Sequence, residues 1–84
     1  MLITGLYDKV AERFVQFIPS PNVGLLKRDF KNAVNQPKSV YNTNAEDFNI
    51  VQLVELDDST GVCLSSEQKL LFTLDELKDD PQVQ

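Results

Sequence analysis

The chain has 84 residues, of which 42% are apolar and 25% charged, and its formal net charge at pH 7 is −5. These values indicate one small folded domain, because disordered chains lack so large an apolar fraction. There is no histidine, and Cys63 is the single cysteine, which excludes an intramolecular disulfide, a cysteine-based zinc site and a histidine general base.

The first twenty residues predict a β-hairpin. Residues 2–7 (LITGLY) form an apolar run, and residues 13–18 (RFVQFI) are rich in β-formers and end at Pro19. The connector between them has a length that is typical of hairpin loops. Within one regular strand Phe14 and Phe17 are expected to point to opposite faces of the sheet, because an odd number of positions separates them.

The clearest helix follows this hairpin. Ser20 and Asn22 are alternative N-caps, and Pro37 ends the pattern because a proline disfavours helical dihedrals at the residue before it. The sequence therefore predicts a helix over residues 21–35. Its apolar residues are spaced three and four apart on one face, at Val23, Leu26, Phe30, Ala33 and Val34.

The second half of the chain predicts a loop and another hairpin. Residues 38–44 are polar and loop-like, and Asn44 is expected to cap a short turn that reaches Phe48. Residues 49–56 (NIVQLVEL) and 61–65 (GVCLS) have the composition of paired strands. The link between them is rich in aspartate and is followed by a glycine, as hairpin turns favour.

The segment from residue 68 to residue 77 is open to two interpretations, a fifth strand or the start of a helix. Alternation of Leu70, Phe72 and Leu74 favours a strand over residues 68–73, followed by a helical turn at 75–78. We therefore expect an α+β fold with an antiparallel sheet of four to five strands and one main amphipathic helix packed on one face. Residues 1–78 are expected to form this single domain, and residues 79–84 an acidic polar tail.

The sequence gives little support for a catalytic or metal-binding site. Cys63 lies in an apolar strand, where a thiol is expected to be inert packing. The carboxylates of Glu55, Asp57 and Asp58 cluster at a predicted turn and lack the ligand pattern of a calcium loop. We expect no catalytic residue, no metal and no cofactor, and hence a binding protein rather than an enzyme.

The few basic residues provide the candidate binding site. Those on the predicted helix lie off its apolar face, although Asp29 weakens their field, and a solvated helix face is the alternative interpretation. Basic side chains grouped in this way can contact phosphates, and aromatic residues beside them can stack on unpaired bases. The candidate nucleic-acid-binding residues are Lys27, Arg28, Lys31, Lys38 and Arg13.

Nothing in the sequence predicts membrane insertion or export. The longest apolar stretch, residues 70–74, is interrupted by Thr73 and is too short to cross a bilayer. The first residues lack the basic region of a signal peptide, and we therefore expect a cytoplasmic protein.

Three segments resemble the small nonstructural protein of microviruses in the gokushovirus group. They are residues 6–11 (LYDKVA), residues 45–48 (AEDF) and residues 54–61 (VELDDSTG), which resemble the family's "YD…A" opening, its "EDF/EDY" turn and its strand ending in "DD-x-TG". Leu56 departs from the aromatic residue that is common there, and the acidic tail has no counterpart. The resemblance implies a nonstructural protein of the infected bacterial cytoplasm, associated with single-stranded DNA synthesis or packaging.

The sequence is compatible with two functions from different classes. The first is a phage accessory protein that binds single-stranded DNA or the replication complex during genome replication or packaging. The second is a protein–protein adaptor that acts through a sheet edge or an oligomeric face, with viral replication or capsid proteins as partners. A homodimer is expected in either case, because the strand at 49–56 has apolar residues on both faces.

Overall fold

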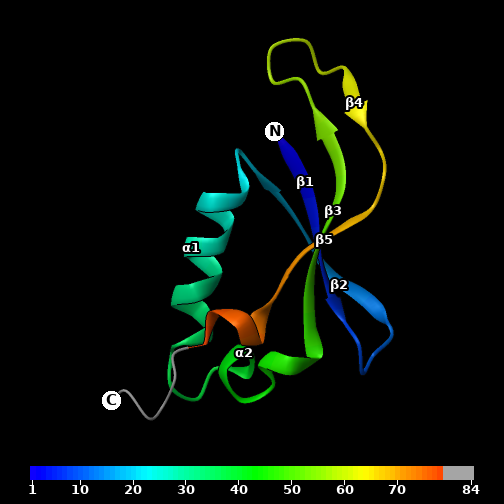
Figure 1. Cartoon of the computed structure of the whole chain (residues 1–84). Coiled ribbons are helices and arrows are strands. Elements are labelled where there is room, and N and C mark those ends of the chain that lie inside the picture. The colour runs from blue at the N-terminus through cyan, green and yellow to red at the C-terminus, as the bar shows by residue number, and fades with distance from the viewer. Residues whose placement is uncertain (79–84) are drawn as a thin grey trace.

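The computed structural model describes residues 1–78 (Figure 1). The predicted acidic tail, residues 79–84, lies outside the described residues. The elements, with η denoting a 3₁₀ helix, are β1 (Leu2–Asp8), β2 (Arg13–Ser20), α1 (Val23–Val34), α2 (Val40–Thr43), η1 (Ala45–Asp47), β3 (Phe48–Leu56), β4 (Cys63–Ser65), β5 (Lys69–Thr73) and η2 (Leu74–Leu77).

The strands form one antiparallel sheet in the order β2-β1-β3-β4, with β5 also paired to β3. Strand β3 is long enough to hold two partners along one edge, because β5 pairs with its first half and β4 with its last two residues. Helix α1 lies against one face of this sheet (Figure 1). The predicted α+β fold, with an antiparallel sheet and one main helix on one face, is confirmed.

The hydrophobic core lies between α1 and the sheet. Leu26, Phe30 and Val34 recur at steps of four along α1 and face inward, as the periodicity predicts. Residues from η1 and η2 close the lower end of the core, where Leu74 is fully buried. On the sheet side the core is made by Leu6, Phe48, Ile50 and Phe72.

Two boundaries differ from the sequence prediction. Strand β2 continues through Pro19 to Ser20, because β2 is an edge strand and the missing proline N–H removes no ladder bond there. The predicted loop at 38–44 contains the single-turn helix α2, which the Ser39 side chain caps by accepting a hydrogen bond from the Tyr41 N–H. Asn22, one of the two alternative caps, accepts from the Leu25 N–H at 2.8 Å at the start of α1.

The prediction that Phe14 and Phe17 point to opposite faces is wrong. Leu6 pairs with Gln16 and Tyr7 with Phe14, so Val15 is an extra residue without a partner in the register. This β-bulge resets the alternation of side chains. The two phenylalanine rings consequently lie on the same face, with their centroids 5.8 Å apart.

The β3–β4 hairpin has the predicted turn chemistry. The Asp57 carboxylate accepts hydrogen bonds from the Ser59 N–H and hydroxyl, and Gly61 takes a φ of +76°. These hydrogen bonds lower the pKa of the Asp57 carboxyl. Cys63, expected as buried packing, is instead exposed, because β4 is a three-residue strand at the end of the sheet.

The last described segment resolves the ambiguity at residues 68–77 in favour of the strand. Strand β5 pairs with β3, and the chain then turns into η2, whose Leu74 and Leu77 enter the core. Among residues 1–78, no helix has the length and hydrophobicity needed to cross a membrane.

Candidate nucleic-acid interface

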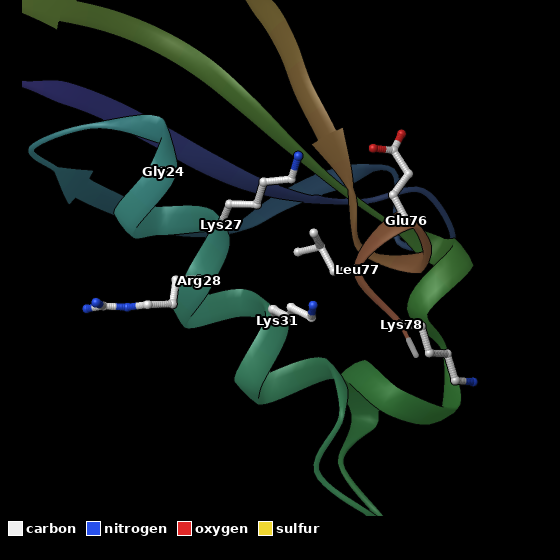
Figure 2. A pocket seen from close by; sticks show the side chains of 7 residues that line it. All are labelled: Gly24, Lys27, Arg28, Lys31, Glu76, Leu77 and Lys78. Carbon is white, nitrogen blue, oxygen red and sulfur yellow. The ribbon is translucent and has the colours of Figure 1, made fainter. Parts of the chain in front are cut away.

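An open groove of about 540 Å³ runs between α1 and η2 (Figure 2). We call it the basic groove. Its floor includes Leu77 of η2, whose side chain points toward α1 in Figure 2. The residues that line it are Gly24, Lys27, Arg28, Lys31, Glu76, Leu77 and Lys78.

Helix α1 supplies three of the groove's cations, because its apolar residues face the core and leave its basic residues on the exposed side. Lys27 and Lys31 are four residues apart, so both lie on one side of the helix, one turn after the other. Their side chains extend toward η2, whereas Arg28 points away from it (Figure 2). The rise between Lys27 and Lys31 along the helix axis is about 6 Å.

The fourth cation, Lys78, comes from the other wall. Segment η2 is held against α1 by the buried Leu77 side chain and by a hydrogen bond of 3.1 Å from the Asn35 side-chain amide to the Leu77 carbonyl. This docking brings Lys78 to the groove although it is 47 residues from Lys31 in the chain. Sequence reasoning missed Lys78, because only the tertiary contact of η2 with α1 makes it a neighbour of the helix.

The groove concentrates positive charge in an acidic protein. Four of the eight Lys and Arg residues line it, although the net charge of the chain is −5. Two carboxylates oppose this field: Glu76 lines the groove, and Asp29 lies 3.9 Å from the Arg28 Nε. The Arg28–Asp29 pair is exposed and therefore weak, so it leaves the guanidinium available to a ligand.

Lys27 also has an aromatic neighbour. Its Nζ lies 6.0 Å from the centroid of the Phe72 ring, at the outer limit of a cation–π interaction. The ring itself is buried in β5, so it orients the ammonium group without offering a stacking surface of its own.

The other two sequence candidates lie elsewhere. Arg13 is the first residue of β2 and pairs with Asp8 at the turn end of the first hairpin, away from α1 in Figure 1. Lys38 lies in the turn between α1 and α2 with a φ of +68°. Neither residue lines the basic groove. The structure thus groups Lys27, Arg28 and Lys31 and separates them from Arg13 and Lys38.

The groove is suited to electrostatic binding of an anion. In the part of the chain that the structure describes, no three side chains of His, Cys, Asp or Glu are grouped to hold a metal ion. The acidic cluster at Asp57 and Asp58 serves the hairpin, where Asp58 pairs with the N-terminal ammonium group.

Comparison with known proteins identifies the family. The family model described as "Phage ORF5 protein" matches residues 1–77. The chain belongs to this family. The match spans the strands and helices described within residues 1–78, including both walls of the groove up to Leu77. It is therefore a bacteriophage protein, in agreement with the phage resemblance of its sequence. No curated protein and no solved structure matches the chain.

Proposed function

We propose that this chain is a phage accessory protein that binds single-stranded DNA through phosphate contacts in the basic groove. It would act in the cytoplasm of the infected bacterium, during replication or packaging of the phage genome. Binding rather than catalysis would be its whole role.

The observation that carries the proposal is the distribution of charge. A protein with a net charge of −5 repels a polyanion at long range, so binding requires a local surface that overcomes this field. Half of the Lys and Arg residues line one groove that is open to solvent. Each phosphate neutralised there releases counterions, which favours binding at low salt.

The spacing of the cations suits a strand of nucleic acid better than an isolated anion. Lys27 and Lys31 follow one another along α1 at about 6 Å, a step comparable to the separation of neighbouring phosphates in an extended single strand. Lys78 lines the opposite wall with its side chain pointing away from α1 (Figure 2), so a strand running along α1 would meet Lys27 and Lys31 first.

The resemblance to gokushovirus nonstructural proteins supports the choice of nucleic acid and the biological setting. That group is associated with single-stranded DNA synthesis and packaging. Membership of the Phage ORF5 protein family places the chain in a bacteriophage, where replicating DNA is an available partner.

The test is a titration of fluorescently labelled oligo(dT) with the protein at several salt concentrations, read by anisotropy. If all four groove cations contact phosphates, log K should fall with log[salt] with a slope of about −2.8. The double variant Lys27→Gln/Lys31→Gln retains two contacts and should show a slope of about −1.4. Between 50 and 200 mM salt, this corresponds to a loss of about 50-fold in affinity for the wild type and about 7-fold for the variant.

A matched control removes the same net charge outside the groove. Arg13→Gln/Lys38→Gln changes two of the sequence candidates that the structure keeps apart from α1, and it should preserve the wild-type slope. The absence of measurable binding at low salt would eliminate the DNA function. Equal slopes for the two double variants would eliminate the groove as its site.

A further inference from the structure

One face of the sheet has no cover within residues 1–78. Helices α1 and α2 and segment η2 all contribute to the single core on the other face. The bulge at Val15 places Tyr7, Phe14 and Phe17 together on the uncovered side, where Phe14 pairs with Tyr7 and Phe17 pairs with Gly5. We call this the open face, and its side chains are Tyr7, Phe14, Phe17, Val51, Leu53 and Leu70.

The middle of the open face is flat because Gly5 has no side chain. The Phe14 ring lies directly across Gly5, so that a Cβ built there would be 2.6 Å from the Phe14 Cδ1 and 3.2 Å from the Leu53 Cδ1. Around this centre Phe17 and Leu70 remain 62% and 57% exposed. A contiguous apolar surface of this kind on a small protein marks an interaction site.

The open face carries no charge. None of its six side chains is ionisable at neutral pH, and the acidic residues that give the chain its net charge lie outside this set. An uncharged face cannot attract a DNA backbone or a basic partner electrostatically. Its natural complement is a second apolar and equally flat surface.

We infer that the open face is the interface of a symmetric homodimer, in which two sheets pack face to face. A second copy provides the required complement, because a two-fold contact brings the same patch together from both subunits. Stacked sheets pack with their apolar faces about 10 Å apart. The acidic side chains stay away from the contact, so two chains of net charge −5 approach without burying like charges.

The area is sufficient for such a dimer. Strand β1 has seven residues, which span about 23 Å, and β2, β1, β3 and β5 together are about 19 Å wide. The projected footprint is therefore roughly 440 Å² per copy, or roughly 900 Å² for two copies. This footprint is close to the ~1,000 Å² lower bound of biological interfaces and below the ~1,200 Å² of most stable ones, as suits a dimer that dissociates on dilution.

This arrangement leaves the two basic grooves on the outer sides of the dimer, because α1 and η2 lie on the opposite face of each sheet. The dimer is independent of the proposed DNA function and is tested without DNA.

The test is sedimentation velocity over a range of protein concentrations, in reductant so that the exposed Cys63 forms no disulfide between chains. We expect the wild type to be a dimer that dissociates on dilution in roughly the micromolar range. Phe17→Lys should raise the dissociation constant by about 100-fold or more, since the two-fold symmetry removes two aromatic anchors and buries two ammonium groups. Leu70→Lys should act in the same direction.

The matched control is Val40→Lys on α2, which is 54% exposed and belongs to the side of the sheet that α1 covers. It should dimerise like the wild type. Circular dichroism establishes that each variant is folded, and hydroxyl-radical footprinting of the wild type supplies a second measurement that needs no variant. Dimerisation should protect Phe17 and Leu70 as concentration rises.

A wild type that remains monomeric up to about 1 mM overturns the inference. Dimers that survive both open-face substitutions, or that only Val40→Lys disrupts, also overturn it. A monomeric protein whose Phe17 becomes protected only when oligo(dT) is added would assign the open face to unpaired bases instead.

Discussion

Replacing Gly5 with alanine should destabilise the protein through one steric conflict on the open face. The new methyl group would lie 2.6 Å from the Phe14 Cδ1, 2.8 Å from its Cε1 and 3.2 Å from the Leu53 Cδ1. Carbon atoms in good contact are about 3.5–4.0 Å apart, so the Phe14 ring has to move by about 1 Å. Overpacking of this kind typically costs about 1–3 kcal/mol.

The cost is partly offset in the unfolded chain. Alanine has less conformational freedom to lose than glycine, which is worth about 0.4–1 kcal/mol. The expected net loss is therefore about 1–2 kcal/mol, which lowers the midpoint of thermal unfolding by roughly 4–16 °C for a domain of this size. Urea unfolding followed by circular dichroism, at one fixed protein concentration, measures it.

Two further variants make this prediction specific. Gly5→Ala in a Phe14→Ala background should cost little, because the ring that the methyl group meets is gone, and the cycle should give a coupling of about 1 kcal/mol or more. Gly24→Ala is the control: its methyl group meets only the Asn22 Oδ1 at 3.4 Å, and alanine in α1 should stabilise by about 0.5–1 kcal/mol. Equal costs of Gly5→Ala in both backgrounds would refute the reasoning.

Three other perturbations test the cap of α1, the groove and the β3–β4 hairpin in turn. Asn22→Ala removes the cap of α1 and should cost about 1 kcal/mol by urea unfolding; an unchanged midpoint would contradict the cap. Glu76→Gln removes an opposing carboxylate and should strengthen oligo(dT) binding about twofold at low salt in the anisotropy assay, whereas weaker binding would contradict a phosphate nearby. Asp57 has a pKa below its ordinary value of 3.8, so its carboxylate stabilises the fold above that pH and loses this effect as the pH falls through the folded-state pKa. Thermal unfolding of Asp57→Ala should therefore lie below that of the wild type at pH ~6 and converge with it in strong acid, and a constant difference at all pH values would contradict this assignment.

Local patterns were sufficient for most of the fold. The spacing of Leu26, Phe30 and Val34 identified α1, and the aspartate-rich link before Gly61 identified the second hairpin. The alternation of residues 70–74 identified β5. These predictions succeeded because each depends on interactions within a few neighbouring residues.

The predictions that failed depend on the position of a residue within the sheet. Pro19 ends a strand only where its N–H is needed, and on an edge strand it is not. Cys63 belongs to an apolar run, yet β4 reaches beyond the core and leaves the thiol exposed. The bulge at Val15 moved Phe14 to the face of Phe17, and no local signal predicted where β1 and β2 would slip.

The candidate site shows the same division. The helical period alone grouped Lys27, Arg28 and Lys31, because residues three or four positions apart lie on one side of a helix. Neither the exclusion of Arg13 and Lys38 nor the inclusion of Lys78 could be obtained in that way.

The sequence by itself determined the class of this protein: a small acidic α+β domain whose cations are few and whose histidines are absent, with phage-type segments in order. Only the tertiary structure decided which surfaces exist. Docking of Leu77 onto α1 made a groove from residues far apart in the chain, and one unpaired residue in β2 gathered three aromatic rings on an uncovered face. The physical reason is that periodicity assigns residues to the faces of one element, whereas a binding surface forms where faces of different elements meet.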